Sequence, residues 1–491
     1  MCITRGISNN SKLSGIILVL IILFHLNRLI NNFSVGDDDI WHFDLAKNIV
    51  ETGICKIGYR PFNYENIISL SYPPLHPFLN AISLKIFGIN YHSIFIPSFI
   101  LYIASCLLFL LLSNKYLPTN MALISTILFL TDPLFFSFGL LGRQESTAIF
   151  LYLLTGVFFY MAHIRAKYLL WIAMGIFSGL LFMTTYNGIW IPISVFLYLI
   201  ITKFKRAKEI LTYYFFSGLI VFPYLCWIYL DEQRSKIFWF QISRSSSYNL
   251  YWLKKLLNPI ADFYLIFFRH YSIYPFLFLI SVIVLWKYRG KYLPLILLLI
   301  VPCIMMIGNM RAAHYLLITI GVCYLSFGFA LQELMSNKRW ESLFMRNRKI
   351  IYTIVSIIFI LNMSFNTLLT FRKPDFIPDM VYYRKVLTEN TEKSSRIVGD
   401  AGLFLAMSEG RKFFTVVPLI WDRWRLMYKY DEIFNILNPD YIVLTDRIKT
   451  WVELKHPQGK AFQDLLKQKF SLIKEIHDIK HGGLWIYKRF R

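Results

Sequence analysis

Long apolar blocks are the feature that most constrains how this chain of 491 residues can fold. The first block runs from Ser14 to Ile30, follows Arg5 and Lys12, and ends without a small-residue cleavage site, so we expect a retained anchor. Ten further blocks approach the roughly 20 residues that a helix needs to cross a bilayer. They cover residues 92–113, 120–141, 144–164, 168–186, 188–202, 210–230, 273–286, 292–308, 312–334 and 350–371. The pattern predicts an α-helical polytopic membrane protein with about 11 transmembrane helices, within a range of about 10–13.

The composition excludes several other classes of protein. Hydrophobic residues make up 56% of the chain and charged residues only 16%, whereas soluble domains carry about 25% charged residues. Intrinsic disorder, a disulfide scaffold and an ordinary soluble enzyme are therefore excluded. The net charge of +23 could indicate a nucleic-acid partner. A membrane explains this charge better, so we expect the lipid bilayer as a partner and no nucleic acid.

The placement of the basic residues predicts the orientation. If the N-terminus is cytoplasmic and the chain changes sides at every span, 17 Lys and Arg residues lie in cytoplasmic connections. The short outer connections then hold only Arg143 and Arg311. This is the positive-inside pattern of a multi-pass membrane protein. The six cysteines form no disulfide or metal-binding spacing, which fits a prokaryotic plasma-membrane protein.

The sequence predicts two domains. Residues 1–371 form the transmembrane domain, with an acidic first outer loop at 31–91, and residues 372–491 form an extracytoplasmic α/β domain. The tail contains 22 basic and 15 acidic residues, and its short apolar runs are typical of a small soluble domain. We expect strands at 396–400, 413–417, 441–445, 471–476 and 483–488, and helices at 379–389 and 460–469.

Acidic residues are concentrated in the first outer loop, which holds six of the 14 in residues 1–371. Asp37, Asp38 and Asp39 are consecutive, and such carboxylates need a cation, a proton or full hydration. One acid would serve as a helix cap, while three indicate a functional site. The helix that follows is amphipathic, with Trp41 and Leu45 on one face, and we expect it to lie in the membrane interface.

Two further acids belong to the third and fourth spans. Asp132 precedes Pro133 inside an apolar run, so it is either a functional intramembrane acid or a local partner at a proline kink. Glu145 begins the fourth span after Arg143, where it either pairs with that arginine at the helix start or belongs to the site. Asp38, Asp39 and Glu145 all face the outer side in this topology.

Four motifs resemble those of the GT-C superfamily of membrane glycosyltransferases. Asp38-Asp39 with Glu51-Thr52-Gly53 resembles the "Asp-Glu … Thr-Gly" signature of the family's first loop. The other three are Tyr72-Pro73-Pro74-Leu75 with Leu84-Lys85-Ile86-Phe87-Gly88, then Arg143-Gln144-Glu145, then Arg311 with Tyr315-Leu316-Leu317. The relatives that the chain resembles most are the protein O-mannosyltransferases and the aminoarabinose transferases of lipid A. It departs from the latter at Tyr72, where they carry a lysine.

The resemblance implies an inverting glycosyltransferase. Such enzymes move a sugar from a polyprenyl-phosphate carrier to an acceptor hydroxyl on a protein, lipid or glycan. For this chemistry the candidate catalytic residues are Asp38, as the base, with Asp39 and Glu145, which would orient the acceptor or hold Mg²⁺ or Mn²⁺. No organic cofactor is expected. The candidate substrate-binding residues are Arg143, Arg311, Tyr315, His76 and Arg269.

The sequence also leaves other functions open. The main alternative is a transporter or flippase for a lipid-linked or small anionic substrate, for which the broken helix at Asp132-Pro133 is the only indication. A purely structural or binding membrane protein is the third, and it does not explain the acidic outer loop. In the tail, Asp400 and Asp446 each follow a predicted strand, where turn or cap roles are expected.

Overall fold

The computed structural model divides into two compact units. It describes residues 37–56, 73–139, 141–232, 272–305, 317–336, 348–371, 380–400, 412–415, 437–446, 448–450, 459–478 and 482–490, with a few isolated residues between these ranges. Unit one contains residues 1–32, 70–79 and 95–372, and unit two contains residues 33–69, 80–94 and 373–491. The division at residue 372 lies where the sequence predicts the tail domain to begin. The catalytic and extracytoplasmic assignments of the two domains stay predictions.

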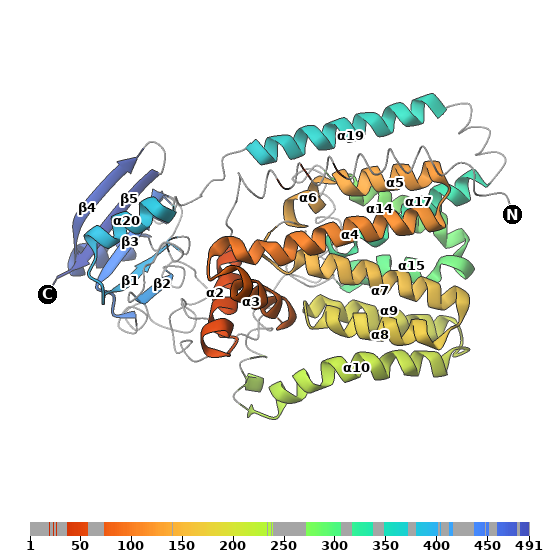
Figure 1. Cartoon of the computed structure of the whole chain (residues 1–491), viewed down its shortest axis with the longest axis horizontal. Coiled ribbons are helices and arrows are strands. Elements are labelled where there is room, and N and C mark those ends of the chain that lie inside the picture. Colours follow the sequence, from red (N-terminus) through yellow and green to blue (C-terminus); the bar gives the residue numbers. More distant parts are fainter. Residues whose placement is uncertain are drawn as a thin grey trace. The chain divides into compact units, whose positions relative to one another are not determined.

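Unit one is a bundle of helices that run side by side (Figure 1). In chain order they are α4 (Phe95–Tyr116), α5 (Thr119–Thr131), α6 (Pro133–Gly139), α7 (Glu145–Arg165), α8 (Tyr168–Phe182), η3 (Tyr186–Ile189), α9 (Trp190–Ile201), α10 (Ala207–Tyr229), α14 (Tyr274–Lys287), α15 (Arg289–Met305), η4 (Leu317–Thr319), α17 (Ile320–Met335) and α19 (Arg348–Phe371). Helix occupies all ten blocks predicted after the first, and most of the first block lies outside the described residues. The predicted helical membrane fold is confirmed.

Several of these helices have the length and composition of membrane spans. Four of the described helices qualify outright: Tyr91–Tyr116, Glu145–Arg165, Ala207–Tyr229 and Leu317–Met335. Five shorter apolar helices accompany them. Many large apolar side chains on the outer surface are exposed, such as Leu111, Leu169 and Ile283. A lipid environment accommodates such a surface, whereas water does not.

Small residues let α8 and α10 pack closely. Gly175 and Gly179 are four residues apart on α8, as in the small-xxx-small pattern of membrane helices. A Cβ atom on Gly175 would lie 2.5 Å from the carbonyl oxygen of Tyr213, and one on Gly179 would lie 2.7 Å from Cβ of Ile220. Ser178 adds a hydrogen bond of 2.8 Å between its hydroxyl and that of Tyr213. Only glycine permits this helix spacing.

The predicted third span is two helices, α5 and α6, which meet at Asp132. Proline 133 cannot continue the hydrogen-bond ladder, and the fully buried carboxylate of Asp132 caps α6 by accepting from the backbone N–H groups of Leu134 (2.8 Å) and Phe135 (3.2 Å). Its second oxygen accepts from the hydroxyls of Ser272 (2.6 Å) and Tyr324 (2.5 Å). Asp132 therefore joins α5 and α6 to α17 and to the segment before α14, which favours the proline-kink interpretation over a functional acid.

Replacing Asp132 should destabilise the bundle more than removing any single one of its hydrogen-bond donors. Asp132→Ala leaves two buried hydroxyls and two N–H groups without their acceptor, at a cost of roughly 3 kcal/mol. Tyr324→Phe removes one bond, for which we expect about 1 kcal/mol, the scale measured in membrane bundles. Thermal unfolding of both variants in detergent measures this order. Equal midpoints for Asp132→Ala and the wild type would contradict it.

Unit two combines outer-loop helices with a five-stranded sheet. Its helices are α2 (Asp37–Thr52), the second half of α3 (Leu75–Phe87), η2 (Tyr91–Ile94), α20 (Met380–Asn390) and α25 (Gly459–Lys469). The strands are β1 (Arg396–Gly399), β2 (Lys412–Thr415), β3 (Tyr441–Thr445), β4 (Phe470–Asp478) and β5 (Gly482–Arg489). They follow the order β2-β1-β3-β5-β4, with β1 parallel to β2 and β3, and β5 antiparallel to β3 and β4. The α/β character of the tail is confirmed.

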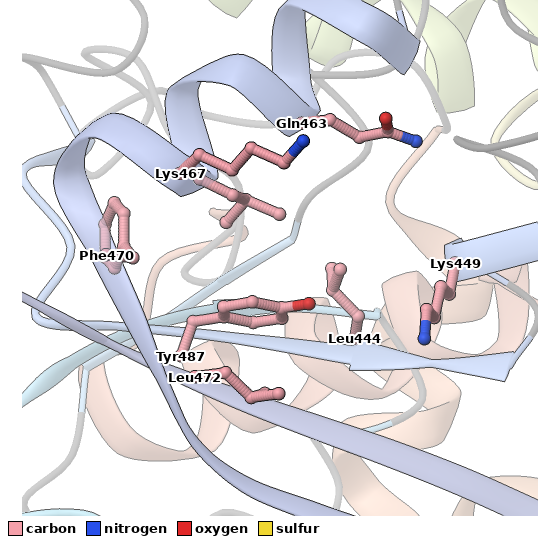
Figure 2. Close-up of a pocket in the computed structure, with 8 residues that line it drawn as sticks. Leu444, Lys449, Gln463, Lys467, Phe470, Leu472 and Tyr487 are labelled. Carbon is pink, nitrogen blue, oxygen red and sulfur yellow. The ribbon is translucent and has the colours of Figure 1, made fainter.

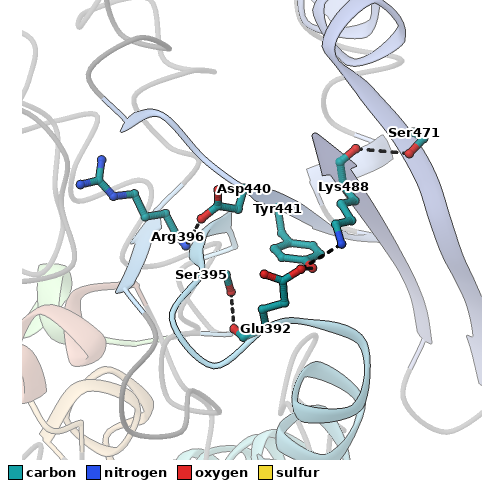
Figure 3. Close-up of polar contacts among 7 residues, drawn as sticks. All are labelled: Glu392, Ser395, Arg396, Asp440, Tyr441, Ser471 and Lys488. Carbon is teal, nitrogen blue, oxygen red and sulfur yellow. Dashed lines mark hydrogen bonds and ion pairs between the residues drawn. The ribbon is translucent and has the colours of Figure 1, made fainter. Parts of the chain in front are cut away.

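Polar contacts fasten the start of the sheet to the end of α20 (Figure 3). The carboxylate of Glu392 accepts from Lys488 of β5 at 3.0 Å and from the hydroxyl of Tyr441 at 3.4 Å. The backbone N–H of Arg396 donates to the carboxylate of Asp440 at 2.7 Å, which holds β1 beside β3. These contacts come from three segments that are distant in sequence, so they fix the register of the sheet.

The two acids singled out after strands are structural. Asp400 is buried and accepts a hydrogen bond of 2.9 Å from the hydroxyl of Thr445 at the end of β3. Asp446 accepts from the backbone N–H of Gly483 at the start of β5. Both carboxylates satisfy polar groups at strand ends, as expected for turn and cap residues.

Candidate functional site

The first two residues of α3, Leu75 and His76, are each bonded to other parts of unit one. Pro73 and Pro74 interrupt regular structure, and the backbone N–H of Leu75 then donates to the carbonyl of Met183 at the end of α8 (2.8 Å). The next residue, His76, is fully buried and bonds to the turn that precedes α7. The stiff proline segment therefore positions a histidine against the start of the fourth span.

Both ring nitrogens of His76 are used within the protein. Nε2 lies 3.1 Å from the carbonyl oxygen of Gly142, and Nδ1 lies 3.0 Å from the hydroxyl of Thr147. A carbonyl can only accept, so Nε2 carries the proton, and Nδ1 accepts from Thr147 when the ring is neutral. The pKa of His76 is lowered from 6.5 to about 4, mainly by burial; the hydrogen bond to the Gly142 carbonyl opposes this shift and the nearby Arg143 guanidinium adds to it. A neutral His76 thus spans the turn from Gly142 to Thr147.

That turn carries a buried ion pair. Nη2 of Arg143 lies 2.7 Å from Oε1 of Glu145, and their side chains are only 13% and 4% exposed. Glu145 is the first residue of α7, where the helix dipole stabilises a negative charge. The carbonyl of Arg143 also accepts from the hydroxyl of Ser98 on α4 at 3.2 Å. The prediction that Glu145 pairs with Arg143 at the helix start is confirmed, and the pair is more deeply buried than a cap requires.

The acidic cluster of the first outer loop begins α2 in unit two. Asp39 is fully buried in the first turn of this helix, and Asp38 precedes it there, although its side chain is not described. Trp41 and Leu45 are buried too, and in fact every residue from 39 to 46 is. The first half of α2 is therefore covered by protein on all its faces, and its location at the membrane interface stays a prediction. A buried carboxylate such as Asp39 is costly unless it is bonded or functional.

The structure thus places the predicted site residues in two groups. Arg143 and Glu145 lie at one turn of unit one, and His76 of α3 contacts that turn. Asp38 and Asp39 belong to unit two. The convergence of the two groups stays a prediction. Arg269, Arg311 and Tyr315 lie outside the described residues, as does the Tyr72 at which the chain departs from the aminoarabinose branch.

The sequence did not indicate a role for Ser98 or Thr147. Ser98 of α4 bonds to the Arg143 carbonyl, and Thr147 in the first turn of α7 bonds to His76. Both are hydroxyl residues in largely apolar helices, and such residues usually bond back to their own helix. No pattern distinguishes these two. Only the long-range partner identifies them: His76 for Thr147, and the Arg143 carbonyl for Ser98.

The described residues contain no group of three or more His, Cys, Asp or Glu side chains arranged to hold a metal ion. One oxygen of Glu145 already accepts from Arg143. The predicted ligands of Mg²⁺ or Mn²⁺ are Asp38, Asp39 and Glu145, whose carboxylate oxygens suit these hard cations. The metal stays a prediction.

The buried neutral state of His76 predicts a pH dependence of stability. Between its ordinary pKa of 6.5 and its value of about 4 in the fold, the unfolded chain binds more protons than the folded one. The contribution of His76 is thus complete above pH 6.5 and is lost as the pH falls toward 4. His76→Gln keeps a donor toward Gly142 but does not titrate, so its thermal midpoint should fall less than that of the wild type over this range.

The matched control is His92→Gln, since His92 is exposed. This variant should keep the pH dependence of the wild type when thermal unfolding is measured in detergent from pH 7.5 to 4.5. Parallel curves for His76→Gln and the wild type would show that His76 is not held neutral by the fold.

The turn before α7 lies within a part of the chain that matches a family model. Residues 71–227 match the family model described as dolichyl-phosphate-mannose-protein mannosyltransferase. The matched part contains the Pro-Pro segment, His76 and the Arg143–Glu145 pair, whereas the acidic motif of the first loop and Arg311 lie outside it. No curated protein matches the chain.

Solved structures match nearly the whole chain. ArnT from Cupriavidus metallidurans, bound to undecaprenyl phosphate, is 12% identical with a TM-score of 0.63, and the match covers 97% of each chain. The archaeal oligosaccharyltransferase AglB from Archaeoglobus fulgidus, in complex with an inhibitory peptide and a dolichol-phosphate, is 12% identical with a TM-score of 0.61, covering 96% of this chain and 74% of AglB. These matches show that the chain has the fold of the ArnT and AglB structures, with apolar helices as in a multi-pass membrane protein, and the mannosyltransferase family model matches residues 71–227 of it.

Proposed function

We propose that the protein is an inverting glycosyltransferase that moves a sugar from a polyprenyl-phosphate carrier to an acceptor hydroxyl. The observation that carries the proposal is the buried Arg143–Glu145 pair at the start of α7, inside the matched residues and clamped by His76. A buried ion pair is costly to maintain in an apolar frame, so its presence beside a helix N-terminus favours a functional role. The lipid phosphates in the ArnT and AglB structures support the proposed class of donor.

In the proposed reaction one carboxylate acts as the base. The acceptor oxygen attacks the anomeric carbon while its proton passes to Asp38, and the bond from that carbon to the phosphate oxygen breaks. A single displacement inverts the anomeric centre. Asp39 and Glu145 orient the acceptor or hold the divalent cation. The buried surroundings of Asp39 exclude water, which would otherwise compete with the acceptor.

The leaving group is an anionic lipid phosphate, so it needs cationic or hydrogen-bond donors at the membrane surface. Arg143 offers a guanidinium that is paired with Glu145. Arg311 is the second candidate, and Tyr315 and Arg269 are further candidates for binding the substrate. His76 acts as a positioning residue, because both its nitrogens are used in holding the turn. The isoprenoid chain would lie among the apolar helices of unit one.

The proposed orientation follows the positive-inside pattern. The N-terminus would be cytoplasmic and the C-terminal domain extracytoplasmic, so transfer would occur on the outer face of a prokaryotic plasma membrane. The acceptor would be a protein, lipid or glycan of the cell envelope, and the sugar a hexose or pentose. Transport, the alternative function, depends on Asp132, which is fully buried with both oxygens bonded to the protein. That arrangement supports a structural role for Asp132. It therefore favours the enzyme hypothesis over the transporter hypothesis.

A transfer assay tests the proposal. Purified protein in lipid vesicles is incubated with radiolabelled polyprenyl-phosphate sugars and candidate acceptors, and the label is followed from the organic phase to the acceptor. Asp38→Asn should lower the rate at least about a hundredfold, the scale of a lost general base. Arg143→Ala should slow transfer by a similar factor of about 100 through the lost stabilisation of the leaving phosphate. Dependence on Mg²⁺ or Mn²⁺ is measured by adding a chelator.

The control is Glu232→Gln, which changes an acid whose side chain is 83% exposed just after α10. It should transfer at the rate of the wild type. Full activity of Asp38→Asn in correctly inserted protein would remove Asp38 as the base, and vesicle uptake of the sugar without any transfer would favour the transporter.

A further inference from the structure

A pocket in the C-terminal sheet belongs to neither the proposed transfer site nor its matched residues. It lies between α25 and the strands β3, β4 and β5, and it has a volume of about 340 Å³. Protein interiors are normally packed to crystal-like density, and small-molecule sites begin at about 300 Å³. A gap of this size between a helix and its sheet is large enough for a small organic ligand.

The interior of the pocket is apolar. Leu444 of β3, Leu466 of α25 and Phe470 at the start of β4 are all nearly fully buried. Leu472 of β4 is 46% exposed and lies at the mouth. Figure 2 shows the strand residues Leu444, Tyr487 and Leu472 facing the side chains of α25 across the opening. These walls suit an aromatic or branched aliphatic body.

The polar residues that line the pocket are cationic or neutral. Lys467 and Gln463 project from the same face of α25, and Figure 2 shows their polar ends close together on the helix side. Lys449 lines the opposite part, with its ammonium 3.8 Å from the centre of the Trp485 ring. No described lining residue is acidic, and Lys467 makes no ion pair with a described residue. The pocket therefore complements a negative charge.

We propose that this pocket binds a small organic anion with an apolar body, its carboxylate or phosphate head bonded to Lys467 and Gln463. The body would fill the space against Leu444, Leu466 and Phe470. A charged head explains why two lysines line an otherwise apolar cavity, and the body explains the volume that side chains leave unfilled. Every described residue that lines the site belongs to the sheet domain.

Fluorine NMR on the full chain in lipid nanodiscs tests the proposal. The probes are 4-(trifluoromethyl)phenylacetate and 4-(trifluoromethyl)phenyl phosphate, with 4-(trifluoromethyl)phenylacetamide as the uncharged analogue and empty nanodiscs as the blank. At least one anion should show saturable line broadening with protein present, and the amide should bind about tenfold more weakly because it lacks the charge-assisted hydrogen bond.

Two variants examine the two halves of the pocket. Lys467→Met keeps the apolar stem but removes the charge, and it should weaken binding of the anion about tenfold. Leu472→Trp places an indole at the exposed mouth and should abolish binding by occupying the space, without disturbing the buried core. Lys474→Met is the matched control, since Lys474 is exposed on β4 outside the pocket, and it should bind as the wild type does.

Equal affinity of the amide and the anions, or unchanged binding in both Lys467→Met and Leu472→Trp, would overturn the proposal. Absence of saturable binding by either anion would do the same. These outcomes are independent of glycosyl transfer, because the readout is binding to the sheet domain and requires no turnover.

Discussion

Polar groups inside a membrane have no water to bond, so this fold depends on partners that the protein supplies itself. Asp132 shows the constraint most clearly, because its two oxygens accept from a capped helix start and from the hydroxyls of Ser272 and Tyr324. Arg143 and Glu145 satisfy each other at the start of α7. The Asp132 contacts draw together segments that are distant in sequence, and so help to determine how the apolar helices are positioned.

The sequence predicted the fold well, for physical reasons. Apolar blocks of spanning length appear as helices, and the alternating runs of the tail appear as β1 to β5 within one or two residues. It placed one span at 120–141 and raised a proline kink at Asp132-Pro133 within it; the structure has two helices there, α5 and α6, which hydropathy alone does not separate. An amphipathic pattern could not show that protein covers every face of the first half of α2, because it does not identify the neighbours that pack against the polar side.

The candidate site could be predicted in part. Arg143 and Glu145 were recognisable from their spacing at a helix start, and the structure pairs them. The role of His76 could not be, because its partners are a carbonyl and a hydroxyl more than 60 residues further along the chain. The same holds for Ser98. A hydroxyl in an apolar helix has the same local sequence whether it bonds to its own backbone or holds a functional turn.

We propose that Asp38 and Asp39 of α2 and the Arg143–Glu145 pair of α7 act at one outer-face site. The most direct measurement is a cryo-electron microscopy structure of the full chain with polyprenyl phosphate bound. We predict that the phosphate contacts Arg143 and that Asp39 and Glu145 line the same cavity. A phosphate bound near Tyr160, at the other end of α7, or acids that open to separate cavities, would contradict the claim.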